Sequence, residues 1–143
     1  MRLTAPRWFD ELPSTNSWLL QRLRDDAPEG DRVVPGLVVA ARRQTAGRGR
    51  QGRTWLAGDG RDLAVSLAMA VPGEDPRRLG GLAMALALGV ADWIESLGGR
   101  ARVKWPNDVQ ADSYDHPGTW GKIAGILVES TGRFAAAGVV GGG

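Results

Sequence analysis

The sequence predicts an α+β protein in which a β-sheet is covered by helices on one side. Short apolar runs typical of strands outnumber the two segments with helical spacing of apolar residues. The order along the chain is strand, helix, two strands, helix and four strands, which does not fit the regular alternation of a parallel sheet. With 143 residues and 21 glycines, the chain is expected to form one domain with many tight turns.

The N-terminal half begins with a short edge strand and a capped helix. Ser14 or Thr15 is typical of an N-cap, and the helix that it starts is expected to run through Leu23. The polar segment 25–36 contains prolines and glycines and is expected to be a loop. The strands expected in this half are Trp8–Phe9, Leu37–Ala41 and Leu63–Met69.

The second half holds a long helix and four short strands. Pro76 is expected to start the helix, and the glycine pair 98–99 is expected to end it. Apolar residues at helical spacing predict a core-facing stripe of Leu79, Leu82, Ala83, Leu86, Val90, Trp93, Ile94 and Leu97. The four strands expected after it are Arg102–Trp105, Val109–Ala111, Ile123–Glu129 and Phe134–Val140, the last two as a hairpin.

Composition excludes several kinds of site. The chain has no cysteine, and its one histidine is His116. The absence of cysteine excludes a disulfide scaffold, a thiolate zinc site, an iron–sulfur cluster and a cysteine nucleophile. With a single histidine, a Ser-His-Asp triad is not expected. No apolar run reaches the roughly 18 residues of a membrane span, and the first residues lack the apolar core of a signal peptide. A soluble, cytoplasmic protein is expected.

The charged residues single out two lysines. The chain has 18 basic and 16 acidic residues, a net charge of +2. Nearly all the basic residues are arginine, and the two exceptions are Lys104 and Lys122. An ammonium group is a compact point charge on a flexible stem, unlike the planar guanidinium group. These two positions are therefore candidates for a role that arginine does not fill.

Residues 47–53 (Gly-Arg-Gly-Arg-Gln-Gly-Arg), followed by Thr54 and Trp55, form an unusual cationic segment. Glycines allow the backbone to approach an anion closely, and arginines donate paired hydrogen bonds to phosphate oxygens. The segment suits a loop over a phosphorylated ligand, but a solvated basic loop or an arginine-rich nucleic-acid tether fits the same composition. It is not a P-loop, because the Gly-Lys-Ser/Thr ending is missing.

Three further segments combine turn chemistry with polar groups. Residues 104–108 (Lys-Trp-Pro-Asn-Asp) are either a strand-to-strand turn with the tryptophan packed beneath it, or a cation and carboxylate that orient a nucleotide or a magnesium ion. Residues 121–129 contain Lys122 and Gly125, and the glycine indicates either a β-bulge or a close approach. Residues 14–16 (Ser-Thr-Asn) are a helix start whose side chains can also bind a neutral polar head such as a urea.

Taken together and in this order, these segments resemble the motifs of the biotin–protein ligases. The matching residues are Ser14–Asn16, Gln44–Trp55, Lys104–Asp108 and Lys122–Glu129, and the resemblance extends from Trp8 to Gly143. It implies the catalytic-domain fold of the biotin/lipoate protein ligases, a mixed and largely antiparallel sheet similar to that of the class II aminoacyl-tRNA synthetases. Residues 1–143 would form the N-terminal portion of this domain in a ligase of the monofunctional type.

The resemblance implies a two-step reaction. The carboxylate of biotin attacks the α-phosphate of ATP to give biotinyl-5′-AMP and pyrophosphate. A lysine of a biotin carboxyl carrier protein, as in acetyl-CoA carboxylase, then attacks the mixed anhydride and releases AMP. The implied ligands are biotin and ATP with Mg²⁺; DNA and membrane partners are not expected. An unpaired sheet edge would allow a homodimer.

Site residues follow from the positions of the matching motifs. The residues expected to be catalytic are Lys122, Arg50 and Arg48, with Lys122 placed at the junction of carboxyl and phosphoryl groups. The biotin-binding residues are Ser14, Thr15, Asn16, Gln44, Gly47, Arg48, Gly49, Arg50, Gly52, Trp55, Lys122 and Gly125. The nucleotide-binding residues are Arg50, Arg53, Trp55, Lys104, Asn107, Asp108 and Lys122. Asp108 is also the candidate metal ligand.

The chain also departs from the family pattern. Biotin–protein ligases continue after the last matching strand with a Gly-x-Gly-x-Asn segment, further helices and a small C-terminal domain, whereas this sequence ends at Gly143. An incomplete catalytic domain without C-terminal or DNA-binding domains is therefore expected, with the ATP side most affected. Segment 111–121 is also longer than in compact relatives. The alternative functions are a lipoate ligase or octanoyl transferase of the same fold, an inactive remnant, and an arginine-rich nucleic-acid binder.

Overall fold

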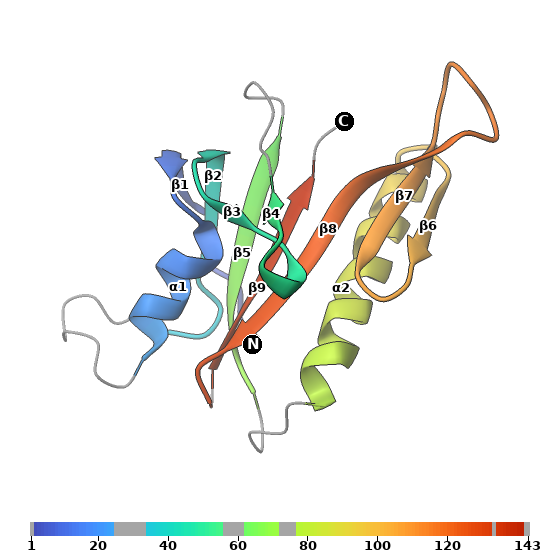
Figure 1. The fold of residues 1–143 in the computed structure, drawn as a ribbon. Helices are drawn as coiled ribbons and strands as arrows, with labels where there is room; N and C mark the ends of the chain where they lie inside the picture. Colours follow the sequence, from blue (N-terminus) through green and yellow to red (C-terminus); the bar gives the residue numbers. More distant parts are fainter. Residues whose placement is uncertain (1, 25–33, 56–61, 72–76, 133, 142–143) are drawn as a thin grey trace.

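The computed structural model describes residues 2–24, 34–55, 62–71, 77–132 and 134–141. Within these ranges it contains a seven-stranded sheet, a two-stranded ribbon and two α-helices (Figure 1). The strands of the sheet are β1 (Arg7–Leu12), β2 (Val38–Gln44), β5 (Leu63–Ala70), β6 (Ala101–Lys104), β7 (Asp108–Asp112), β8 (Trp120–Ser130) and β9 (Phe134–Gly141). The remaining elements are the ribbon of β3 (Gly47–Arg48) and β4 (Thr54–Trp55), a 3-10 turn between them (Arg50–Gly52), and the helices α1 (Thr15–Leu23) and α2 (Arg77–Ser96).

The sheet is mixed and largely antiparallel, as the resemblance implied. The strand order is β1-β2-β5-β9-β8-β7-β6. β1 and β2 pair in parallel, with α1 between them in the chain, and every other neighbouring pair is antiparallel. The predicted α+β class is confirmed.

The strands expected from apolar alternation are all present, and all except β6 are longer than predicted. β1, for example, extends over Arg7–Leu12 rather than Trp8–Phe9 alone. β2 continues to Gln44 rather than ending at Ala41, and β8 begins at Trp120 rather than at Ile123. The added residues include arginine, glycine and lysine, which have low strand propensity. Their conformation comes from pairing with β1 and β7, which sequence periodicity does not show. The predicted loop 25–36 lies mostly outside the described residues.

The helix α1 begins where its cap predicts. The hydroxyl of Ser14 accepts a hydrogen bond from the N–H of Ser17 at 3.3 Å, and the Ser14 backbone is extended. Leu19 and Leu23 are buried in one core cluster with Val39 of β2. This packing holds the second half of α1 against the sheet.

Removal of the cap is expected to destabilise the protein. In Ser14→Ala, the Ser17 N–H loses its acceptor at a buried position. The loss of such a cap costs about 0.5–2 kcal/mol, so the midpoint of urea unfolding should fall while the slope of the transition stays unchanged. Ser130→Ala, at an exposed strand end, is the control and should change the free energy of unfolding by less than about 0.5 kcal/mol. Equal losses in the two variants would contradict a capping role.

The helix α2 packs on β6, β7 and β8 through an alanine-rich face. Its buried residues are Ala87 and Ala91, and the half-buried residues beside them are Ala83, Leu86, Val90 and Ile94. The prediction that Trp93 and Leu97 belong to this face is wrong, because they are 62% and 70% exposed. Small side chains let the helix approach the sheet, and the larger tryptophan lies to one side of the contact.

Residues 78–96 of α2 form the one helix, among the described residues, that is long and apolar enough to cross a membrane, with a mean hydropathy of 1.3. Its contacts with β6, β7 and β8 account for the apolar side chains on one face. The predicted end of the helix is confirmed. Gly98 has a positive φ of 86°, and its N–H bonds to the carbonyl of Glu95 at 2.9 Å.

The two helices lie on opposite faces of the sheet, whereas the sequence placed them on one side. Successive strand residues point to alternate faces. On β9, Ala136 belongs to the cluster beneath α1, and Val139, an odd number of positions away, belongs to the cluster beneath α2. Figure 1 shows α1 and the ribbon β3–β4 in front of the sheet and α2 behind β7. Central strands that are apolar on both faces accept helices on either face, so the pattern alone does not assign the side.

Candidate active site

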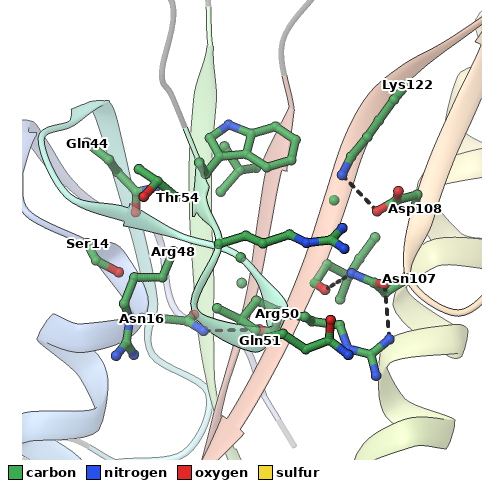
Figure 2. Close-up of a pocket in the computed structure, with 18 of the residues that line it drawn as sticks. Ser14, Asn16, Gln44, Arg48, Arg50, Gln51, Thr54, Asn107, Asp108 and Lys122 are labelled. Carbon is green, nitrogen blue, oxygen red and sulfur yellow. Dashed lines mark hydrogen bonds and ion pairs between the residues drawn. The ribbon is translucent and has the colours of Figure 1, made fainter.

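A cavity of about 540 Å³ lies on the α1 face of the sheet and collects residues from all four sequence motifs. Its walls come from the first turn of α1, the ribbon, the turn before β7, and strands β5, β8 and β9 (Figure 2). Of the predicted site residues, all of which the structure describes, Gly47 and Gly52 do not line it. Those that do are Ser14, Thr15, Asn16, Gln44, Arg48, Gly49, Arg50, Arg53, Trp55, Lys104, Asn107, Asp108, Lys122 and Gly125.

The floor of the cavity consists of neutral polar side chains. Gln44 Oε1 accepts hydrogen bonds from the backbone N–H of Thr15 at 2.8 Å and from its hydroxyl at 3.0 Å. Ser66 Oγ lies 2.7 Å from both Thr15 Oγ1 and Asn16 Oδ1 and can donate its one proton to either. All these side chains are buried. A buried network with its partners in place favours one arrangement of the floor.

Asn16 uses most of its amide group within the protein. Its Nδ2 donates to the carbonyl of Leu127 at 3.0 Å and to Glu129 Oε2 at 3.1 Å, and it lies 3.4 Å from the carbonyl of Ala136. Its Oδ1 lies 2.7 Å from Ser66 Oγ. An amide has two N–H protons and two carbonyl lone pairs. A ligand can therefore use one remaining lone pair of Oδ1, which accepts a hydrogen bond from an N–H group.

Two glycines leave room for side chains of the site. A Cβ on Gly138 would lie 2.5 Å from Asn16 Oδ1, and a Cβ on Gly125 would lie 2.8 Å from the Trp55 ring and 3.3 Å from Lys122 Nζ. At Gly125 the sequence predicted the close approach of a ligand or a backbone, and the structure instead shows two side chains there, the Trp55 ring and the Lys122 ammonium group, in the space that a side chain would fill.

The β-bulge considered for the same segment is also present. The register of β7 and β8 shifts between the pairs Val109–Ala124 and Gln110–Lys122, which leaves Ile123 unpaired. An extra residue in one strand reverses the face to which the following side chains point. Lys122 therefore lines the same cavity as Gly125, although strict alternation would place the two on opposite faces.

The arginine–glycine segment is folded as a ribbon. Gly47 of β3 pairs with Trp55 of β4, and Gln51 and Gly52 turn the chain with positive φ angles of 58° and 72°. A Cβ on Gly47 would lie 2.7 Å from the carbonyl oxygen of Trp55. Gly47 and Gly52 are therefore required by the backbone conformation of the ribbon and do not form the wall of the cavity.

The three arginines of the ribbon have different surroundings. Arg48 Nη2 lies 2.6 and 2.8 Å from the two carboxylate oxygens of Glu129. Arg50 Nη1 donates to Asn107 Oδ1 at 3.2 Å. Arg53 lines the cavity with no side-chain hydrogen bond to any residue in the described ranges. Arg50 and Arg53 are thus better placed than Arg48 to meet an anionic ligand.

Lys122 is held at the rim by a carboxylate and an aromatic ring. Its Nζ lies 2.8 Å from Asp108 Oδ1 and 4.6 Å from the centre of the Trp55 ring. Lys104 was expected to support Asp108, and the two are register partners in β6 and β7. The ion pair of Asp108 is nevertheless formed with Lys122, which the bulge turns toward it. Trp55 Nε1 is buried without a hydrogen-bond partner among the described residues, so it remains a donor for a ligand.

The turn between β6 and β7 is tied to β8 through Asn107. The Asn107 side chain donates to the carbonyl of Ile126 at 2.8 Å, and its backbone carbonyl accepts from the Ile126 N–H at 2.9 Å. The Trp105–Pro106 peptide bond is cis. Trp105 is 78% exposed at the edge of the cavity, which corrects the expectation that it packs beneath the turn.

Sequence reasoning assigned no role to several residues that build the site. The most important are Ser66, Leu127, Glu129 and Gly138. Ser66 could have been found, since it is the one polar residue in the apolar run of β5 and a buried polar residue in a strand needs partners. Leu127 contributes its backbone carbonyl, which no side-chain pattern reveals.

The described residues contain no group of three or more acidic or histidine side chains that could hold a metal ion. Oδ1 of Asp108, the predicted metal ligand, forms an ion pair with Lys122. Mg²⁺ is commonly bound through one or two carboxylates together with substrate phosphates. An ion at this site would depend on phosphate oxygens for most of its ligands, and the role of Asp108 in binding it stays a prediction.

The cavity combines a floor of buried neutral polar side chains with cationic groups at its rim, on a mixed sheet with helices on both faces. The chain belongs to the biotin/lipoate A/B protein ligase family, whose sequence model matches residues 8–143. It is 36% identical over 123 residues to the bifunctional ligase/repressor BirA of Escherichia coli (strain K12), a match that covers 85% of this chain and 34% of BirA.

Two further proteins of this family are similar to the chain. The biotin–[acetyl-CoA-carboxylase] ligase of Mycobacterium tuberculosis is 36% identical over 130 residues, which cover 88% of this chain and 44% of that protein. The structure of the biotin protein ligase from Aquifex aeolicus in complex with biotin and ATP has a TM-score of 0.71 at 30% identity, and covers 95% of this chain and 51% of that chain. The chain therefore spans between 34% and 51% of the length of these three relatives.

Proposed function

We propose that this chain supplies the biotin-binding and adenylate-forming site of an ATP-dependent biotin–protein ligase. The observation that carries the proposal is the polarity of the cavity. Buried neutral groups of Thr15, Gln44 and Ser66 form its floor, and Arg53 and Lys122 supply cationic groups at its rim. Biotin has the matching polarity, with a neutral urea at one end and a carboxylate at the other. The names of the relatives above support the same ligand.

In the first step, a carboxylate oxygen of biotin attacks the α-phosphorus of ATP, the bond to the β-phosphate oxygen breaks, and pyrophosphate leaves. Both reactants are anions, so fixed cations lower their repulsion and stabilise the charge that develops at phosphorus. Lys122 fits this role, because Asp108 and Trp55 hold its ammonium group at the rim without a ligand. Arg50 and Arg53 would face the phosphates from the ribbon.

In the second step, the amine of a carrier lysine attacks the carboxyl carbon of biotinyl-5′-AMP. The bond from this carbon to the phosphate oxygen breaks, AMP leaves with its electrons, and the amine loses a proton to solvent. The same cations stabilise the departing phosphate. The carrier is proposed to be a biotin carboxyl carrier protein, as the names of the relatives suggest. The predicted cytoplasmic location and homodimer stay predictions.

The floor of the cavity disfavours lipoate as the ligand. The dithiolane ring of lipoate has no N–H group, so it cannot donate to the remaining lone pair of the buried Asn16 Oδ1, and an unsatisfied buried acceptor costs about 1–3 kcal/mol. An archaeal bi-partite lipoate protein ligase shares the fold, with a TM-score of 0.59 at 14% identity, and that likeness supports the fold alone. An arginine-rich nucleic-acid tether is also disfavoured, because Arg48 and Arg50 are bonded to Glu129 and Asn107.

Calorimetric titration of biotin into the chain, with and without α,β-methylene-ATP, tests the proposal. The expected result is saturable binding of one biotin per chain that survives high salt, because the neutral floor is insensitive to screening. The nucleotide analogue should raise the affinity for biotin, because its phosphates would contact the ribbon arginines. Pyrophosphate release on mixing biotin with ATP would then measure adenylate formation.

Lipoate is the matched ligand control. It should bind about ten- to a hundredfold more weakly than biotin, since it leaves the remaining lone pair of Asn16 Oδ1 without a donor. Equal affinity for the two acids, or no saturable biotin binding by a folded sample, would overturn the assignment of biotin. Biotin binding without a gain from the nucleotide would retain the biotin site and reject the adenylate-forming role.

A further inference from the structure

We propose that Glu129 is a positioning residue that fastens the ribbon β3–β4 to the floor of the cavity. Glu129 lies near the end of β8, and it is not among the residues that line the cavity. Its carboxylate nevertheless contacts both the ribbon and the floor. The biotin readout used below depends on the proposed function, whereas the position of the ribbon does not.

The ribbon needs anchors outside itself. Each of its strands has two residues, and a two-stranded hairpin of any length is marginally stable in water. Its entry is held by backbone bonds from Thr45 to Leu12 at 3.0 Å and from Ala46 to Pro13 at 2.9 Å. The residues beyond this entry depend on side-chain contacts with the sheet.

The contact between Arg48 and Glu129 is the shorter of the two hydrogen-bonded side-chain anchors of the ribbon arginines. The two N–O distances, 2.6 and 2.8 Å, place one guanidinium nitrogen between both carboxylate oxygens. The contact from Arg50 to Asn107 is longer, at 3.2 Å, and its acceptor is neutral. The Arg48 and Glu129 side chains are 48% and 27% exposed, so this charge-assisted pair is partly screened by solvent, but less so than the pair of Arg43 and Glu11, at 65% and 54%.

Glu129 joins the ribbon to the floor because it has a second partner. Its Oε2 also accepts a hydrogen bond from Nδ2 of the buried Asn16 at 3.1 Å. Figure 2 shows Arg48 on the Asn16 side of the site, across the cavity from Lys122. One carboxylate therefore orients a floor residue and holds an arginine of the ribbon. Groups that share one acceptor in this way respond together when it is removed.

This arrangement keeps the ribbon over the cavity before a ligand arrives. Arg50, Arg53 and Trp55 then already occupy their places in the cavity wall. Without the contact, ligand binding would have to order the ribbon, and that ordering cost would appear as weaker binding. Arg48, which the sequence placed among the catalytic residues, would act through this contact on the position of its neighbours.

The variant Glu129→Gln tests the proposal with two measurements. Glutamine keeps the shape and still offers Asn16 an oxygen, but it removes the charge that holds Arg48. Cleavage by trypsin after Arg50 and Arg53, resolved by mass spectrometry, should accelerate about tenfold, as expected for the loss of one charge-assisted hydrogen bond. Cleavage after Arg102 in β6, which reports opening of the sheet, should not change. The Kd for biotin should rise by a similar factor.

Glu11→Gln is the matched control, because Glu11 forms an ion pair with Arg43 at 3.4 Å that is more than half exposed on both sides. It should change neither measurement. In the double variant with Arg48→Gln and Glu129→Gln, trypsin should cleave after Arg50 and Arg53 no faster than in either single variant. Both substitutions remove the same contact.

Three results would overturn the proposal. The first is unchanged cleavage of the ribbon in Glu129→Gln. The second is equal acceleration after Arg102 together with a lower melting temperature, which would make Glu129 a residue of general stability. The third is additive effects in the double variant. Failure of the unaltered chain to bind biotin would reject the proposed function, while the cleavage rates would still decide whether Glu129 holds the ribbon.

Discussion

Replacement of Lys122 by alanine is expected to slow the formation of biotinyl-5′-AMP by about 10²–10³-fold, the usual effect of removing one preorganised group that stabilises transition-state charge. Nζ of Lys122 is held 2.8 Å from Asp108, and the bulge at Ile123 turns it into the cavity. Single-turnover release of pyrophosphate with saturating biotin and ATP measures the effect. The affinity for biotin alone should change much less, because the floor proposed to bind the neutral end of biotin is intact.

Arg78→Ala is the control for removal of a cation. Arg78 is exposed on α2, behind the sheet, and its replacement should leave the rate unchanged. Near-normal adenylate formation by Lys122→Ala would remove Lys122 from the mechanism. A large loss of biotin affinity without a further loss of rate would make it a binding residue instead.

Gly138→Ala is expected to damage both the floor of the site and the stability of the domain. A Cβ at this position would lie 2.5 Å from Asn16 Oδ1 and 3.1 Å from Ser66 Oγ. Asn16 cannot move away without breaking its bonds to Leu127 and Glu129. Overpacking of this kind costs about 1–3 kcal/mol, which urea unfolding would measure. The Kd for biotin should rise by more than about tenfold, because the acceptor Oδ1 is displaced.

Gly89→Ala is the matched control. Gly89 lies in α2, and a Cβ there would have no neighbouring heavy atom within 4 Å. Alanine should stabilise the helix by up to about 1 kcal/mol, since it loses less backbone freedom than glycine on folding. Normal stability and normal biotin affinity in Gly138→Ala would show that Asn16 and Ser66 can move without loss of folding free energy. It would also show that their network does not define the biotin site.

The family motifs predicted most of the residues that line the cavity, but they did not predict the contacts between those residues. Lys104 and Lys122, which the sequence singled out, both line the cavity, and their roles toward a ligand stay predictions. Asp108 pairs with Lys122, because a one-residue bulge changes the face to which that lysine points. A bulge depends on how two strands pair. It leaves little trace in the sequence of either strand alone.

Local physical chemistry, readable along the chain, determined the elements themselves. Alternating apolar residues marked β5, and a side-chain acceptor at Ser14 marked the start of α1. A glycine with positive φ marked the end of α2. Each of these signals acts over a few residues. The sequence by itself therefore determined the two helices and the centres of the seven strands of the sheet, but not the ends of those strands or the ribbon β3–β4. The motif resemblance identified the family.

The tertiary structure alone decided which face each helix covers and which side chains meet. Apolar residues on both faces of β8 and β9 leave the side of each helix open until the sheet assembles. The contact of Arg48 with Glu129 joins residues 81 positions apart, and the contact of Asn16 with Glu129 joins residues 113 positions apart. Such pairs depend on strand order and register. Those are set by the packing of the whole chain and not by the preference of any one segment.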